Sequence, residues 1–80
     1  MPTVLKVKGY RFFFFSLEGG EPPHIHVEHA ERYAKFWLDP IALARSRGFR
    51  RAELSELLKT IEENRQLFKD RWDERFSGQV

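Results

Sequence analysis

The chain of 80 residues contains no cysteine and carries a formal net charge of +2, with 41% hydrophobic, 32% charged and 15% aromatic residues. This length allows one small domain over residues 1–80, and the composition excludes a multidomain enzyme, a disulfide-stabilised scaffold and a Rossmann nucleotide-binding unit. No run approaches the roughly 18 apolar residues of a membrane span, and no signal peptide is evident. We therefore expect a cytoplasmic protein without membrane contact.

The first half of the chain is expected to form antiparallel strands, because short apolar and alternating segments are bounded by turn residues. Four segments are predicted as strands: residues 3–8, 11–16, 24–28 and 33–38. The second strand contains four consecutive phenylalanines, which indicates that both its faces are at least partly covered. Glycines and prolines predict a loop over residues 18–23. Residues 41–46 fit either a short fifth strand or a helical turn.

The pattern from residue 51 to residue 76 is that of one long amphipathic helix. Its apolar residues recur at steps of three and four: Leu54, Leu57, Leu58, Ile61, Phe68, Trp72 and Phe76. Arg65 interrupts this stripe, and we interpret its aliphatic stem as covering apolar surface. The predicted fold is α+β, with an antiparallel sheet of four or five strands packed on one long C-terminal helix.

Strand parity divides the side chains between the two faces of the predicted sheet. One face is apolar and is assigned to the helix-facing core: Leu5, Val7, Phe12, Phe14, Ile25, Val27, Ala34, Phe36 and Leu38. The opposite, uncovered face mixes basic, imidazole and aromatic groups: Val4, Lys6, Lys8, Arg11, Phe13, Phe15, His24, His26, Glu28, Tyr33, Lys35 and Trp37. Its aromatic patch favours a protein interface at Phe13, Phe15, Tyr33 and Trp37, with single-stranded RNA as the alternative ligand. A β-bulge would invert part of this assignment.

His24 and His26 are neighbours on one face of a strand, because residues two apart project to the same side. They are candidates for an acid/base pair that acts on a phosphodiester, since histidine titrates near neutrality. One alternative is a metal site in which Glu28 supplies a third ligand. Another is a pair of surface histidines that pack on neighbouring rings. The His-x-His spacing alone leaves these alternatives open, and we expect no cofactor.

Four arginines lie within seven residues that contain no acidic side chain: Arg45, Arg47, Arg50 and Arg51. With Phe49 among them they suit phosphate contact and base stacking. Arg11 and Lys35 complete the predicted phosphate-binding set. The alternative is a solvated basic turn in which Phe49 acts as a hydrophobic staple.

Three linked segments resemble the small bacterial domain of unknown function 4160: GYRFFFFS at residues 9–16, EPPHIHV at residues 21–27 and AKFWLDP at residues 34–40. The resemblance covers nearly the whole chain, including the Arg-Gly-Phe turn at residues 47–49. Such proteins often carry a serine where Arg50 stands here, so the helix start lacks the usual N-cap residue.

The resemblance implies a product of small paired genes, often next to another short uncharacterised protein, in an arrangement like a toxin–antitoxin operon. We therefore expect a toxin-like component that acts on or binds RNA, with a ribonuclease-type activity open, and that is neutralised by a small protein partner encoded nearby. The alternative is a non-enzymatic interaction module that forms homo- or hetero-oligomers through its aromatic and histidine-bearing sheet face.

Overall fold

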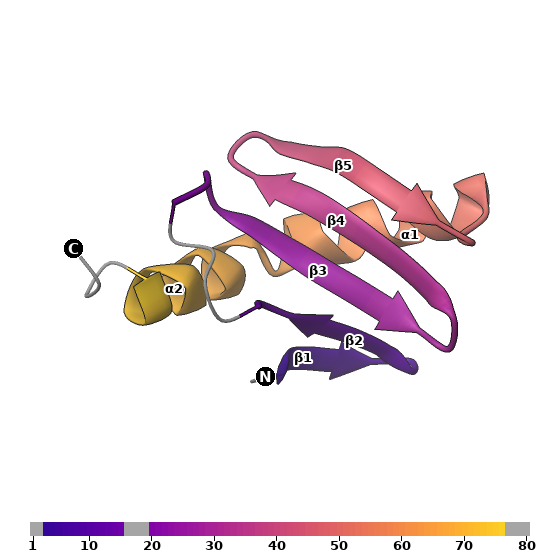
Figure 1. Cartoon of the computed structure of the whole chain (residues 1–80), viewed down its shortest axis with the longest axis horizontal. Coiled ribbons are helices and arrows are strands. Elements are labelled where there is room, and N and C mark those ends of the chain that lie inside the picture. Colours follow the sequence, from indigo (N-terminus) through magenta and orange to yellow (C-terminus); the bar gives the residue numbers. More distant parts are fainter. Residues whose placement is uncertain (1–2, 16–19, 77–80) are drawn as a thin grey trace.

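A computed structural model describes residues 3–15 and 20–76 of the chain. They form an antiparallel five-stranded sheet with helices packed against one face (Figure 1). The strands run in sequence order across the sheet: β1 (Thr3–Val7), β2 (Tyr10–Phe13), β3 (His24–His29), β4 (Arg32–Leu38) and β5 (Ile41–Arg47). Two helices follow: α1 (Arg51–Glu63) and α2 (Arg65–Phe76). The predicted α+β class is confirmed, and the ambiguous segment at residues 41–46 belongs to a fifth strand.

Tight turns explain why consecutive strands are neighbours in the sheet. Lys8 and Gly9, between β1 and β2, have φ angles of 50° and 85°. Positive φ at both central residues is what a type I′ hairpin turn requires. Ala30, between β3 and β4, also has a positive φ, of 55°. Because these connections are short, β1 pairs antiparallel with β2, and β3 with β4.

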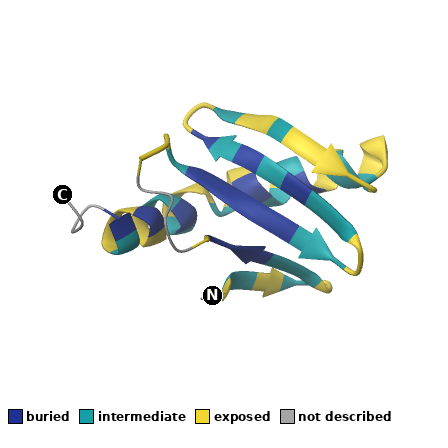
Figure 2. Cartoon of the chain, in the orientation of Figure 1, coloured by how far each residue is buried: buried dark blue, intermediate teal, exposed yellow. Residues whose placement is uncertain are grey.

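The hydrophobic core lies between the sheet and the two helices (Figure 2). Seven buried residues come from the strands and from Phe14, which follows β2, and all were predicted from strand parity: Phe12, Phe14, Ile25, Val27, Ala34, Phe36 and Leu38. The helices supply five more: Leu57, Ile61, Phe68, Trp72 and Phe76. Leu5 and Val7, also predicted for this core, are only partly buried because β1 lies at the edge of the sheet.

The assignment of Val4 to the opposite face is wrong. Thr3 pairs with Phe13 and Leu5 pairs with Phe12, so Val4 is an extra residue in β1. Such a bulge changes the direction of the side chains beyond it. Val4 consequently packs against the core.

The prediction of one long helix over residues 51–76 is also wrong, because the helix breaks at Asn64. The side-chain Nδ2 of Asn64 donates to the carbonyl oxygen of Thr60 at 2.8 Å, and the Asn64 backbone N–H donates to the same oxygen at 3.1 Å. The Asn64 backbone has left helical geometry, with φ of −113° and ψ of 20°. Arg65 is exposed at the start of α2, so its stem does not continue the apolar stripe. The break lets α1 contact β5 and α2 contact β4.

The strand predicted over residues 11–16 is shorter than expected. Strand β2 ends at Phe13, while Ser16 lies outside the described residues. Beyond the strand, Phe14 is buried in the core and Phe15 is exposed. Within the described part of the chain, neither helix has the length and apolar character needed to cross a bilayer.

Candidate functional site

The sheet face opposite the helices, here called the polar face, carries most of the candidate residues. The strand register arranges them in rows across the sheet: Arg11–Glu28–Tyr33–Arg47, Phe13–His26–Lys35–Arg45, and His24–Trp37–Ala42. The pairing therefore places His24, His26 and four of the six predicted phosphate-binding residues on the same face of the sheet.

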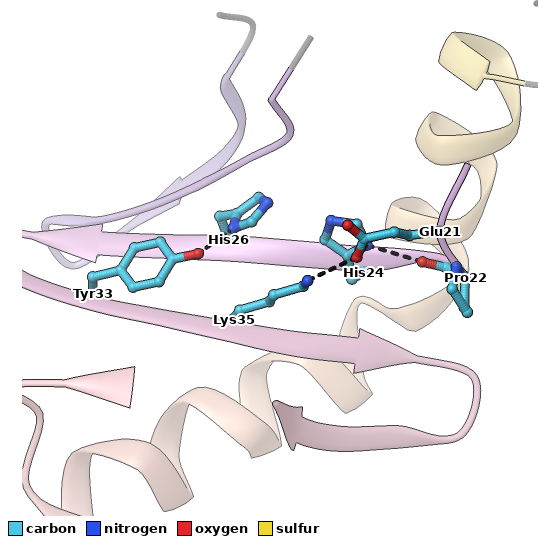
Figure 3. A network of polar contacts seen from close by, with 6 residues as sticks. All are labelled: Glu21, Pro22, His24, His26, Tyr33 and Lys35. Atoms are coloured by element: carbon cyan, nitrogen blue, oxygen red, sulfur yellow. Dashed lines mark hydrogen bonds and ion pairs between the residues drawn. The ribbon is translucent and has the colours of Figure 1, made fainter. Parts of the chain in front are cut away.

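His26 lies inside an aromatic cluster on the polar face, and only 2% of the residue is exposed. Its ring stacks between Phe13 and Tyr33, with centroid distances of 5.5 and 5.8 Å, and meets the edge of Phe15 at 4.4 Å. Its Nδ1 lies 2.6 Å from the Tyr33 hydroxyl (Figure 3). The imidazole is thus hydrogen-bonded to the side chain of Tyr33.

His24 is fully buried where the sheet meets α2. Its Nδ1 lies 2.9 Å from the Pro22 carbonyl oxygen, which only accepts, so Nδ1 carries the hydrogen (Figure 3). The ring contacts Trp37 at 5.6 Å and Trp72 of α2 at 4.9 Å, measured between centroids. The ring centroids of His24 and His26 are 5.0 Å apart. Both histidines pack on neighbouring rings, as one of the alternatives expected, but they are buried and do not lie at the surface. The prediction that this face is uncovered is therefore wrong at Phe13, His24 and His26, which are buried.

Two of the basic residues on the polar face are neutralised by carboxylates. Arg11 forms an ion pair with Glu28 at 2.7 Å, and Lys35 forms one with Glu21 at 2.9 Å (Figure 3). Glu28, the third ligand of the metal hypothesis, is therefore occupied by a guanidinium. Residues 3–15 and 20–76 contain no group of three or more potential metal ligands.

A surface groove of about 420 Å³ lies beside this cluster, at the junction of β4 and β5. It is lined by Phe15, Tyr33, Arg45, Ser46 and Arg47. The guanidinium carbon of Arg45 is 5.9 Å from the centre of the Tyr33 ring. Among the described residues, neither Arg45 nor Arg47 has an acidic partner. The groove therefore offers aromatic faces and two cationic groups whose charge is not neutralised.

The link between His26 and Tyr33 was not predicted from the sequence. Their strands pair so that His26 lies opposite Lys35 and Glu28 lies opposite Tyr33. Tyr33 is thus diagonal to His26, and a long side chain reaches across such a diagonal. Only the strand register, which the sequence left open, could have indicated this contact.

The remaining predicted phosphate contacts lie elsewhere. Arg50 is the N-cap residue of α1, and its backbone N–H donates to the Glu53 carboxylate at 2.9 Å. A guanidinium has no acceptor atom, so only this half of a capping box forms. Arg51 lines a different groove, between α1 and β5. The predicted set is therefore divided, with Arg45 and Arg47 at the polar face and Arg50 and Arg51 at the helix start.

Glu53 connects the start of α1 to the sheet. The hydrogen bond from the Arg50 backbone lowers the pKa of the Glu53 carboxyl below its ordinary value of 4.5, and the positive charge of Arg32 lowers it further. Arg32 also donates a hydrogen bond to this carboxylate, and its guanidinium carbon is 5.8 Å from the centre of the Phe49 ring. Glu53 is therefore structural, and it fixes the turn that follows Arg47.

Comparison with known proteins gives one match. Residues 9–73 match the profile of a family described as "Domain of unknown function (DUF4160)". No curated protein and no solved structure matches the chain. The match covers β2 to β5 and nearly all of the helical region, and so includes the whole groove.

Proposed function

The chain belongs to the family described as "Domain of unknown function (DUF4160)", and because that description assigns no activity, we propose a function from the groove at β4 and β5. The protein binds single-stranded RNA there. Phe15 and Tyr33 stack on bases, while Arg45 and Arg47 bind phosphates. Aromatic platforms combined with basic side chains are how proteins commonly hold single strands.

The observation that carries this proposal is that Arg45 and Arg47 have no acidic partner within the described residues. Arg11 and Lys35, on the same face, are each paired with a carboxylate. A paired cation has little attraction left for a phosphate, whereas an unpaired one attracts the backbone of any nucleic acid. The groove is thus the part of the polar face best suited to a polyanion.

A single strand suits this surface better than a duplex. Stacking on Phe15 and Tyr33 requires bases whose faces are free, and in a duplex those faces are covered by neighbouring base pairs. The groove is open to the surface at the side chains of Phe15 and Tyr33, where unpaired bases can reach both rings.

The burial of His24 and His26 supports binding over acid/base catalysis. A catalytic base must come within hydrogen-bond reach of the group that it deprotonates. Both imidazoles are covered, and Nδ1 of His26 is occupied by Tyr33. We therefore assign His26 a positioning role, in which it holds the Tyr33 ring at the groove.

Binding is tested by fluorescence anisotropy with an end-labelled oligouridine RNA. The double variant Arg45→Gln, Arg47→Gln should weaken binding about tenfold or more, because two phosphate contacts are lost. The matched control, Arg65→Gln with Arg71→Gln, removes the same charge from exposed positions on α2 and should weaken binding less than about threefold. Duplex RNA should compete poorly. Equal losses in the two double variants would show that only net charge matters.

The resemblance to products of paired genes supports a toxin-like role for RNA binding, with a small protein partner that blocks it. Production of the chain alone in bacteria should reduce survival, and production of the neighbouring gene product should restore it. Normal growth in both cases would remove the toxin role and leave RNA binding to be decided by the anisotropy measurement.

A further inference from the structure

We propose that the outer edge of β5 accepts an extended segment of another protein, in which acidic and apolar side chains alternate. This segment adds a sixth, edge strand to the sheet, which is a common mode of peptide recognition. The inference rests on the edge of β5 and on the side chains along it, and it does not depend on RNA binding.

Strand β5 is the longer of the two edge strands. It pairs with β4 and has no second strand partner among the described residues, so one row of its backbone groups faces outward (Figure 1). The other edge strand, β1, has five residues, a bulge at Val4 and the exposed Lys6. A short edge strand that carries an exposed lysine is protected from pairing with another chain. The seven residues of β5 also carry an irregularity, at Ala44, but Ile41 to Leu43 and Arg45 to Arg47 stay in register with β4 on either side of it.

On the helix side, β5 borders an apolar groove of about 360 Å³. Four apolar side chains line it, together with Arg51 and Ser55: Phe36, Leu43, Leu54 and Leu58. Leu43 is 44% exposed, so apolar surface at this edge of the sheet is left uncovered. Apolar side chains of an added strand would cover Leu43 and fill this groove.

On the polar side, β5 presents Arg45 and Arg47. No acidic residue occurs between Asp39 and Glu53, a stretch that also contains Arg50 and Arg51. Charge complementarity therefore selects carboxylates for the partner residues on this side. A second copy of the chain fits less well, because two arginine-rich edges would face one another.

The alternation follows from strand geometry. Successive residues of a strand point to opposite faces of a sheet. A segment paired with β5 therefore places every second residue near the arginines and the residues between them near Leu43. The predicted partner sequence therefore has acidic residues at every second position and apolar residues at the positions between them.

The test uses a capped nine-residue synthetic peptide of alternating glutamate and valine, titrated into the ¹⁵N-labelled full chain and followed by NMR. Saturable shifts are expected in the amide signals of Ile41 to Arg47 and in α1 near Leu54. A peptide of the same composition with glutamates and valines in separate blocks, and one of alternating lysine and valine, should each bind at least tenfold more weakly.

Two variants test the position of the site. Leu43→Glu should weaken binding about tenfold, because it places a carboxylate where apolar contact is needed. Leu43→Thr introduces a residue that favours strands, so β5 should still fold. Its loss of peptide affinity should be intermediate, which shows that the effect comes from docking and not from unfolding. Gln66→Glu adds the same charge at an exposed position on α2; it loses the hydrogen bond to Asp70 but should leave affinity for the peptide unchanged.

Three results would overturn the proposal. The block peptide could bind as well as the alternating one, which would show simple charge attraction. The shifts could fall on Phe15 and Tyr33 and leave β5 unchanged. The free protein could be a dimer that Leu43→Glu converts to a monomer, in which case a second copy occupies the edge. RNA binding by the groove is decided separately, by the anisotropy measurement with the Arg45→Gln, Arg47→Gln variant.

Discussion

The phenolic hydroxyl of Tyr33 lies 2.6 Å from Nδ1 of His26. Tyr33 lines the groove on the polar face, whereas His26 is buried among aromatic rings. This hydrogen bond therefore connects a ring that we propose to stack on RNA with a side chain inside the sheet face. It explains why a buried polar residue is tolerated at the centre of an aromatic cluster.

Tyr33→Phe should destabilise the fold by about 1–3 kcal/mol, because it removes the partner of a buried imidazole nitrogen. Affinity for oligouridine should fall by about threefold, since the ring remains for stacking but loses the hydrogen bond with which His26 positions it. Urea unfolding and anisotropy measure the two effects. Tyr10→Phe is the matched control, because the Tyr10 hydroxyl has no hydrogen-bond partner among the described residues, and it should stay within about 0.5 kcal/mol. Equal destabilisation by the two substitutions would show that the hydrogen bond between Tyr33 and His26 does not stabilise the fold.

Glu53 should make stability depend on pH in the acid range. Its pKa is lowered in the folded chain, chiefly by the Arg50 backbone hydrogen bond, while the unfolded chain has the ordinary value of 4.5. Its stabilising contribution is therefore complete above about pH 4.5 and is lost as the pH falls through the folded pKa. The gap in unfolding free energy between the wild type and Glu53→Gln should be widest near neutral pH and should narrow below about pH 4.5. The exposed Glu56→Gln variant is the control, and a constant gap for Glu53→Gln would argue against this linkage.

Gly48→Ala should be strongly destabilising, whereas Gly20→Ala should be neutral. Gly48 has a φ of +87°, and a Cβ placed there would lie 2.8 Å from Cγ of Arg32. The strained backbone alone costs about 1–3 kcal/mol. A Cβ at Gly20 would have no heavy atom within 4 Å. Thermal unfolding of both variants measures the difference, and similar midpoints would mean that the turn adjusts freely.

The sequence predicted the parts of the fold that follow from local periodicity. Alternation placed Phe12, Ile25 and Phe36 on the helix-facing side, and all three are buried in the core. The break at Asn64 was not predicted, because it is a change in the backbone angles of one residue within an apolar periodicity that continues on both sides of it. A signal was nevertheless present, since Asn64 and Arg65 stand where the apolar stripe required a nonpolar residue.

The candidate site was predicted only in part. Strand parity put His26, Tyr33 and Lys35 on one face, which the register bears out. Parity does not reveal how far neighbouring side chains cover one another, so the burial of His24 and His26 could not be foreseen. It also does not show which cations are neutralised: Lys35 has a carboxylate partner, whereas the groove arginines have none within the described residues.

Strand β5 contributes to both proposed binding sites, because Arg45 and Arg47 line the groove and also flank the free edge. Carboxylates of a paired segment would occupy the same guanidinium groups that an RNA phosphate needs. The two ligands would therefore be negatively linked, and each would lower the affinity of the other by the same factor. A partner that adds one strand would then act as a competitive inhibitor of RNA binding, without any conformational change in the sheet.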